Sequence, residues 1–321
     1  MLKMLREFKM LKVLSLMVGV LLIITALPAF AAQFAHAELM VAPADVEKNK
    51  DKWVILDCRD KANTEDAKTK EVLKGYDSGH IPGAINLGGD CAKILRTKEE
   101  SVVFKDANGK IDAAKYNKIL GDAGISSDKT IVVYADAKRI TNASVGFWIL
   151  DLLGQKDVRF LNGGIEAWEA AGKKLDTKET KLPPAKYEVS LRMNIIATTD
   201  EVLKIAKGEV KGPQIVDSRT PEEYAGTDVR AKKGGHIPKT VLNVSHTGTY
   251  DKKTGIIKSA DELEKLYSKL DKTKRTIPYC QTGTRSTLTY LQFKAMGFKD
   301  VANYDDSWIV WGNKENTPIE K

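Results

Sequence analysis

Short apolar runs alternate with longer amphipathic stretches along most of the chain. Residues 131–134 (Ile-Val-Val-Tyr) have the composition of a strand that is buried on both faces. Residues 261–270 carry apolar side chains at helical spacing, and the segments 143–153 and 287–296 read as helices that end at a glycine. Strands that alternate with helices predict an α/β fold, in which helices cover both faces of a parallel sheet. In such sheets the reacting loops lie beyond the carboxyl ends of the strands.

The first thirty-odd residues follow a different pattern. Residues 1–12 carry four cations and one acid, residues 13–27 are almost wholly apolar, and small residues follow. This order is typical of a secretory signal peptide, with cleavage open after Ala31, Ala32 or Ala37. The alternative is an uncleaved anchor, although about 15 apolar residues fall short of the ~20 that a membrane-spanning helix needs. We therefore expect residues 1–37 to direct the body to the periplasm or an equivalent exported space, and to be its only contact with a membrane.

The remaining residues, about 285, contain an internal repeat. An Asp-x-Arg element is followed by Gly-His-Ile-Pro in both halves, first at Asp57 and His80 and then at Asp217 and His236. The separations are similar, 23 residues in the first half and 19 in the second. We expect two copies of one domain, residues 38–176 and 191–321, joined by an extended linker at 177–190 that contains Leu-Pro-Pro.

Composition narrows the classes of function. The chain is 42% hydrophobic and 29% charged, which fits a globular protein with a real core. Its net charge of +8 includes the four cations of residues 1–12, and the other lysines are scattered, so a nucleic-acid partner is not expected. The mild positive field favours small anionic substrates. The four histidines do not cluster at metal-ligand spacing and no Cys-x-x-Cys occurs, so we expect no metal.

Three cysteines are present, and an odd number in an exported protein leaves at least one outside a disulfide. Cys58 and Cys91 either form a disulfide or remain structural thiols, because sequence does not show the geometry. Cys280 differs from them, since it follows a predicted strand and begins a polar loop that opens a helix. Backbone N–H groups of such a loop and helix N-terminus, together with Arg285, favour the thiolate. A buried structural cysteine would not suit this polar loop.

The motifs D-x-R, G-H-I-P-G-A, L-N-G-G-x-x-x-W and C-x-x-G-x-R resemble those of the rhodanese family, over roughly residues 38–314. The duplicated layout is similar to the family's two-domain thiosulfate and 3-mercaptopyruvate sulfurtransferases. The resemblance implies two tandem rhodanese-like domains and a ping-pong reaction. The Cys280 thiolate would take the outer sulfur of thiosulfate, release sulfite, and pass the persulfide sulfur to cyanide or a thiol. No metal or organic cofactor is implied.

The same resemblance assigns roles around Cys280. The loop amides would cradle the persulfide and the anionic donor, and this loop consists of Gln281, Thr282, Gly283, Thr284, Arg285 and Ser286. The loop is one residue shorter than the phosphate cradle of cysteine phosphatases, which argues against phosphatase chemistry. Asp217 and Arg219 are supporting residues, either an ion pair that fixes a turn or a direct substrate contact. His236 is expected to be structural, because its counterpart His80 lies in a copy without a nucleophile.

Two departures bear on the role of each domain and on the donor. The first copy has Ala135 where the second has Cys280, so domain one is expected to be a non-catalytic partner that packs against domain two. In domain two, Glu223 stands where vertebrate thiosulfate enzymes carry a substrate-binding arginine, and Arg285 would supply the missing positive charge. Thiosulfate is the preferred donor. The alternatives are 3-mercaptopyruvate, a persulfide carrier with little small-molecule turnover, and a binding module with an incidental thiol.

Overall fold

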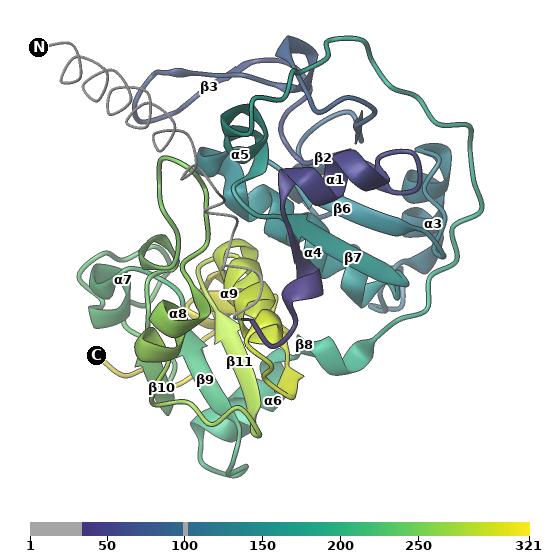
Figure 1. Cartoon of the computed structure of the whole chain (residues 1–321). Coiled ribbons are helices and arrows are strands. Elements are labelled where there is room, and N and C mark those ends of the chain that lie inside the picture. The colour runs from purple at the N-terminus through teal and green to yellow at the C-terminus, as the bar shows by residue number, and fades with distance from the viewer. Residues whose placement is uncertain (1–33, 99–101) are drawn as a thin grey trace, which may run out of the picture.

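The computed structural model describes residues 34–98 and 102–321, and the two copies form two α/β domains that lie against each other (Figure 1). Most of the expected signal peptide lies outside the described residues. Within the described ranges, no helix is long and apolar enough to cross a membrane. The predicted fold class is confirmed, because each domain is built on a parallel sheet with helices packed on it.

Domain one contains a five-stranded parallel sheet. Its spatial order is β1 (Met40–Val41), β7 (Asp157–Leu161), β6 (Thr130–Tyr134), β2 (Val54–Asp57) and β5 (Ile85–Asn86). A short antiparallel hairpin joins β3 (Thr64–Glu65) to β4 (Val72–Leu73). The α-helices are α1 (Pro43–Asn49), α2 (Cys91–Ile94), α3 (Ala113–Asp122), α4 (Ile140–Leu152) and α5 (Gly164–Ala170), and the 3₁₀ turns are η1 (Ala37–Leu39), η2 (Tyr76–Ser78) and η3 (Ala137–Arg139).

Domain two repeats this plan with a smaller sheet. The order is β10 (Thr240–Asn243), β9 (Gln214–Asp217), β11 (Arg275–Tyr279) and β12 (Asp300–Val301), all parallel. A second, two-stranded parallel sheet pairs β13 (Asn303–Tyr304) with β8 (Ile196–Ala197). The helical elements are η4 (Met193–Ile195), α6 (Thr199–Ala206), α7 (Pro221–Ala225), η5 (His246–Gly248), α8 (Ala260–Leu266), α9 (Thr284–Ala295) and α10 (Ser307–Trp311).

The two domains meet along the pair of helices α4 and α9, which are equivalent in the repeat and lie at the centre of the molecule (Figure 1). Both begin three residues before the predicted segments. Helix α4 is buried on nearly all sides, as an apolar helix inside a large core is. Ser144 and Thr287 join the helices by a 2.8 Å hydrogen bond between their buried hydroxyl groups. One hydrophobic core therefore continues from domain one into domain two.

Segments outside the helices also tie the domains together. The linker at 177–190 has no regular structure, but it is fixed to domain one by hydrogen bonds from the Ala185 N–H to the Gly121 carbonyl and from the Ser190 N–H to the Leu153 carbonyl, each 2.9 Å long. At the other end of the chain, Phe34 is buried in the shared core and the His36 N–H donates to the Ala295 carbonyl of α9 at 2.9 Å. The chain then enters β1, which pairs with β7 of domain one. Residues 34–41 thus bridge the two domains.

Cys58 and Cys91 form a disulfide, which decides between the two alternatives left open by the sequence. The bond joins the turn after β2 to the first residue of α2. Gly146 of α4 packs directly on it, since a Cβ at this glycine would lie 2.8 Å from the Cys58 sulfur. The disulfide therefore sits inside domain one at the base of the domain interface.

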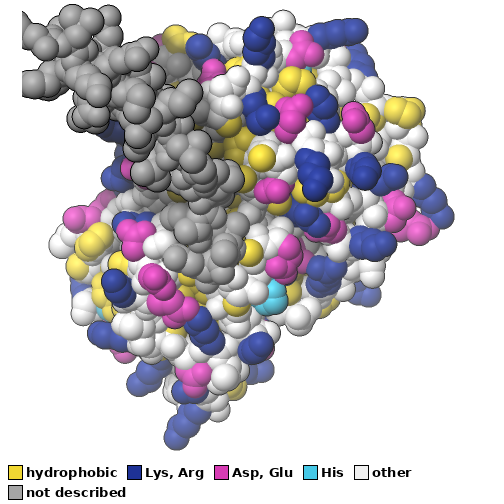
Figure 2. All heavy atoms as spheres, in the orientation of Figure 1, with side chains coloured by type: hydrophobic (Ala, Val, Ile, Leu, Met, Phe, Trp, Pro, Cys, Tyr) yellow, Lys and Arg dark blue, Asp and Glu magenta, His cyan; other side chains and the backbone are white. Residues whose placement is uncertain are grey.

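The outer surface carries no concentrated charge on the face seen in Figure 2. Lysine and arginine side chains are interspersed there with aspartates and glutamates.

Candidate active site

Cys280 lies at the carboxyl end of β11, at the centre of the domain-two sheet, and its side chain is buried. The loop that follows ends at Gly283, which caps α9 with a φ of 70°. A Cβ at this position would lie 2.4 Å from the carbonyl oxygen of Asp305, so only glycine fits. The tight turn places Cys280 beside the N-terminus of a twelve-residue helix, where the helix dipole favours negative charge.

The segment 305–309 fixes the backbone of this loop. The Cys280 N–H donates to the Ser307 hydroxyl at 3.1 Å. In return, the Trp308 N–H donates to the Cys280 carbonyl at 3.0 Å, and the Ile309 N–H donates to the Gln281 carbonyl at 2.8 Å. Ser307 itself adopts a φ of 49°, an uncommon backbone angle for a residue other than glycine. Such strained residues persist where the surrounding structure over-determines them, often at functional sites.

The loop amides that follow Cys280 are not capped by side chains of the protein. Among the described residues, no side chain accepts a hydrogen bond from the backbone N–H groups of Gln281, Thr282, Gly283 or Thr284. The Ser286 hydroxyl lies 3.6 Å from the Cys280 sulfur, within hydrogen-bonding distance for sulfur. Of the predicted loop residues, Ser286 therefore contacts the thiol, and the N–H groups of residues 281–284 remain available to bind an anion.

Arg285 is bound to Glu223 rather than left free for a substrate. Its two terminal nitrogens each lie 2.7 Å from one oxygen of the fully buried Glu223 carboxylate. Burial lowers the pKa of the Arg285 guanidinium, but the hydrogen bonds to Glu223 and the neighbouring Cys280 raise it above its usual value. Burial raises the pKa of Glu223, and Arg285 more than reverses this, so that the pKa falls below its usual value. The cation expected to attract the donor is thus already paired.

Asp217 and Arg219 form a buried ion pair below the loop. The Arg219 guanidinium lies 2.6 Å from the Asp217 carboxylate and also donates to the Gly235 carbonyl at 2.8 Å. The Tyr279 hydroxyl donates to Asp217 at 2.6 Å and accepts from the Ile237 N–H at 3.2 Å. These contacts join the D-x-R turn, the Gly-His-Ile-Pro segment and the end of β11 into one network.

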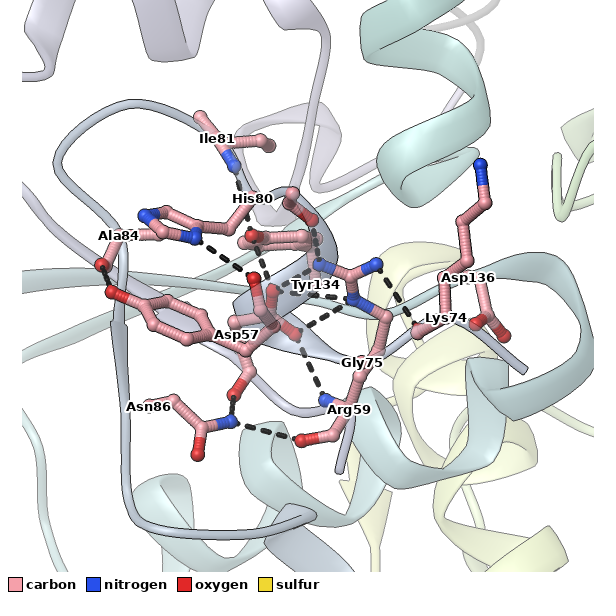
Figure 3. A network of polar contacts seen from close by, with 12 residues as sticks. Asp57, Arg59, Lys74, Gly75, His80, Ile81, Ala84, Asn86, Tyr134 and Asp136 are labelled. Atoms are coloured by element: carbon pink, nitrogen blue, oxygen red, sulfur yellow. Dashed lines mark hydrogen bonds and ion pairs between the residues drawn. The ribbon is translucent and has the colours of Figure 1, made fainter. Parts of the chain in front are cut away.

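Domain one contains the same network, shown in Figure 3. Asp57 binds Arg59 and the Tyr134 hydroxyl, each at 2.6 Å, and that hydroxyl accepts from the Ile81 N–H at 3.1 Å. Because this copy has no cysteine on its loop, the network serves the fold of each domain. The geometry therefore ties Asp217 and Arg219 to one another and to the turn.

The two motif histidines also match. The His236 ring stacks on Tyr224 with a centroid separation of 3.7 Å and contacts the Tyr224 carbonyl at 3.0 Å. The His80 ring stacks on Tyr76 at the same separation and contacts the Tyr76 carbonyl at 3.0 Å. The two rings share these contacts and differ at Nε2, which lies 3.1 Å from the Lys178 carbonyl in His80 and 3.6 Å from the Glu320 carboxylate in His236.

The loop of domain one is closed by its own carboxylates. Ala135 occupies the position of Cys280, and the Ala137 N–H donates to Glu166 at 3.0 Å. The Arg139 N–H donates to Asp136 at 2.8 Å. Two acidic side chains thus accept hydrogen bonds from backbone N–H groups whose counterparts in domain two have no side-chain acceptor.

Two further residues near the loop escaped the sequence reasoning. His246 is the first residue of η5, which follows β10. Its Nδ1 is buried and has no hydrogen-bond partner among the described residues. Burial, helped by the charge of Arg285, lowers the pKa of His246 to about 4. Arg96, from domain one, donates to Thr284 at 2.9 Å. Both residues lie outside the repeated motifs, so no signal in the sequence marks them.

No metal site was found in the part of the chain that the structure describes, where no three His, Cys, Asp or Glu side chains gather in a suitable arrangement. The arrangement around Cys280 can instead support nucleophilic sulfur chemistry. The helix N-terminus and the loop N–H groups that lack a side-chain acceptor are positive ends of backbone dipoles, which favour an anionic sulfur such as a persulfide.

Comparison with known proteins agrees with this geometry. The family model for the rhodanese-like domain matches this chain at residues 42–171 and 198–314. A thiosulfate sulfurtransferase from Corynebacterium glutamicum is 36% identical over 256 residues, which cover 76% of this chain and 81% of the relative. The sulfur carrier protein TtuD from Thermus thermophilus is 34% identical over 307 residues, which cover 90% and 98%.

Among solved structures, wild-type EanB has a TM-score of 0.73 and 21% identity, covering 89% of this chain and 70% of its own, a likeness of fold alone. The matches to the family model span most of the chain, and they fall on both copies of the repeat. The chain therefore belongs to the rhodanese family, with two rhodanese-like domains in tandem.

Proposed function

We propose that this protein is a thiosulfate sulfurtransferase in which Cys280 carries the transferred sulfur as a persulfide. The observation that supports it most is the contrast between the two loops. The domain-two loop presents Cys280 together with open amides, whereas the domain-one loop has Ala135 and amides bound by Glu166 and Asp136. The relative named thiosulfate sulfurtransferase supports the choice of donor.

The reaction follows from the groups at the site. The Cys280 thiolate attacks the outer sulfur of thiosulfate, a new S–S bond forms, and sulfite leaves with the electron pair of the broken S–S bond. The amides of residues 281–284 and the dipole of α9 bind the negative charge of the donor and then of the persulfide. Cyanide or a thiolate next attacks the terminal sulfur, and the Cys280 thiolate leaves and is restored. The Ser286 hydroxyl supports the sulfur anion at 3.6 Å in both steps.

A sulfur carrier is the second candidate, and two observations favour it. The Cys280 side chain is fully buried, and the Thermus thermophilus relative carries the name of a sulfur carrier. A carrier would receive sulfur from a partner and would turn over free donors slowly. The two functions use the same persulfide and differ in the source of the sulfur and in the rate at which free thiosulfate is turned over.

We also propose that the protein works in an exported, oxidising compartment. The order of basic, apolar and small residues in positions 1–37 supports this, and so does the Cys58–Cys91 disulfide, since disulfides persist mainly in such compartments. Cell fractionation of the full-length chain tests the proposal. Recovery of the protein in the cytoplasm with reduced Cys58 and Cys91 would contradict it.

The test of activity uses the chain from residue 33 onward, which retains Phe34 and its contacts. Thiocyanate formation from thiosulfate and cyanide is measured beside the Cys280→Ser variant, and mass spectrometry after thiosulfate alone looks for one added sulfur atom on the Cys280 peptide. Turnover with this adduct, both lost in the variant, supports the proposal. An adduct without turnover favours the carrier. The absence of both adduct and turnover would exclude thiosulfate as donor and make 3-mercaptopyruvate the next substrate to assay.

A further inference from the structure

We propose that Arg96 of the non-catalytic domain is a positioning residue that holds the Cys280 loop in its thiolate-stabilising conformation. The proposal rests on the proposed function, because it assumes that Cys280 is the nucleophile. It assigns to domain one a part in the reaction beyond packing.

Arg96 crosses the domain interface and lies directly against the loop. Its side chain is fully buried, and one terminal nitrogen donates to the Thr284 hydroxyl at 2.9 Å. The other terminal nitrogen forms an ion pair with the Asp305 carboxylate. The guanidinium also packs on Gly283, since a Cβ at that glycine would lie 2.6 Å from it. Arg96 therefore contacts the end of the loop and the first residue of α9.

Asp305 extends this contact to the beginning of the loop. Its carbonyl oxygen lies against Gly283, and its carboxylate accepts the Val103 N–H of domain one at 2.9 Å. The chain then continues through Ser307 and Trp308, which bind the N–H and the carbonyl of Cys280. Arg96 and Asp305 thus fix both ends of the segment that carries the thiol.

The backbone that carries Arg96 is itself held firmly. It follows α2, which begins at Cys91 of the disulfide and is capped by the Asp90 side chain through the Lys93 N–H at 2.9 Å. The Trp148 ring of α4 lies 6.0 Å from the guanidinium, within the range of a cation–π contact. Because Arg96 is held in this way by domain one, its contacts can restrict the motion of the Cys280 loop.

The position of the loop should affect the reactivity of Cys280, because the groups that favour the thiolate act over short distances. The effect of a helix dipole falls off within the first turn, and loop amides stabilise an anion only when they point at it. A loop freed from Arg96 and Asp305 would sample conformations in which the sulfur leaves this cradle. The alkylation of Cys280 would then require a higher pH, and sulfur transfer would slow. An ion pair that served only the domain interface would change stability and leave the reactivity of Cys280 as it was.

The test compares the alkylation of Cys280 by iodoacetamide as a function of pH in the chain from residue 33, with the disulfide intact. The main variant is Arg96→Met with Asp305→Asn, which removes both buried charges together and avoids leaving one unpaired. Arg96→Lys is the conservative variant, because it keeps the charge and loses the planar fork. Tyr290→Phe is the matched control, since it removes another buried contact between the domains, the 2.7 Å hydrogen bond to Asp151.

We expect the double variant to shift the midpoint of the alkylation profile to higher pH and to lower kcat for thiosulfate by about ten-fold or more. The midpoint and kcat of Arg96→Lys should lie between those of the double variant and the wild type. Tyr290→Phe should lower Tm and leave the midpoint unchanged. A midpoint and kcat like those of the wild type in the double variant would overturn the proposal; if that variant does not fold, an unshifted Arg96→Lys would do so. Alkylation needs no sulfur donor, so a wild type without activity would count against the proposed function alone.

Discussion

The Arg285 guanidinium is bound by both oxygens of the buried Glu223 carboxylate, at 2.7 Å each. The pair joins the first turn of α9 to α7, where Glu223 also accepts the Thr220 N–H of the helix cap at 3.2 Å. A cation that could attract an anionic donor is therefore neutralised within the protein. The N–H groups of residues 281–284, the helix dipole and Arg230, which lies 3.8 Å from Glu223, remain to attract an anionic donor.

Glu223→Gln should accordingly strengthen the binding of a dianionic donor. The Arg285 charge would no longer be compensated, so KM for thiosulfate should fall severalfold at low ionic strength, and the gain should shrink as salt is added. Stability should fall by about 3 kcal/mol, because a buried ion pair loses one partner. Steady-state kinetics over a salt series and urea unfolding measure the two effects. Asp122→Asn is the control, since it removes the exposed partner of Lys118 and should change neither quantity much. An unchanged or raised KM in Glu223→Gln would show that Arg285 does not act on the donor.

The sequence predicted the fold because its local patterns occur twice. It predicted the loop because the two copies can be aligned on these patterns. The Asp-x-Arg and Gly-His-Ile-Pro elements appear in each half, and Ala135 against Cys280 at matching positions marked which copy holds the nucleophile. The pairing of Arg285 with Glu223 was missed, since 62 residues separate them and only the tertiary fold brings them together. The expectation that Arg285 would supply a free charge assumed that it had no such partner.

For a similar reason, the internal repeat did not predict the contacts between the domains. Arg96 and Asp305 are 209 residues apart and have no counterpart motif in the other copy. The disulfide was left open because the approach of Cys58 to Cys91 depends on how α2 packs on the sheet and on Gly146. Local patterns thus specify each domain, whereas the residues that join the domains become visible only in the assembled fold.

His246 predicts a loss of stability in mild acid. Burial and Arg285 lower its pKa from 6.5 to about 4 in the folded protein. Between these two values the unfolded chain binds a proton that the folded protein does not, so stability is complete above pH ~6.5 and falls as the pH approaches 4. The loss should amount to roughly 3 kcal/mol. Urea unfolding at several pH values should show it in the wild type and show a smaller loss in His246→Gln. The exposed His36 is a matched control, and His36→Gln should retain the wild-type slope. Equal slopes in the wild type and His246→Gln would contradict the assignment.

The Cys58–Cys91 disulfide should stabilise the protein without taking part in the chemistry. It closes a loop with a sequence separation of 33, for which the chain-entropy estimate is about 3–4 kcal/mol. The double variant Cys58→Ser with Cys91→Ser should lose about that much stability and still form the Cys280 persulfide. Dithiothreitol should destabilise the wild type and leave the double variant unaffected. Loss of persulfide formation in a folded double variant would mean that one of these cysteines is involved in sulfur transfer.

Residues 34–37 should contribute to stability although they precede the first strand. Phe34 is buried, and the His36 N–H bonds the end of α9. A chain that begins at residue 38 loses both contacts and should have a lower Tm than one that begins at residue 33, by the equivalent of about 2–3 kcal/mol. Phe34→Ala in the longer chain should reproduce most of the difference. Equal Tm values for the two chains would show that this segment is not docked in solution.

Restoring a cysteine to domain one should not restore activity. Ala135→Cys would place a thiol at the end of β6, in the position that Cys280 has at the end of β11. However, Glu166 and Asp136 already accept hydrogen bonds from loop amides, so their negative charges would disfavour a second thiolate and repel an anionic donor. We expect Ala135→Cys to take up no sulfur when Cys280 is replaced by serine.

Adding Glu166→Gln and Asp136→Asn removes both charges and should make the introduced thiol more reactive toward iodoacetamide. Mass spectrometry of the peptide that contains the substituted position, after thiosulfate or after iodoacetamide, reads out both cases. Sulfur on that peptide while Glu166 and Asp136 are intact would show that the missing thiol alone, and not the closed cradle, keeps domain one inactive.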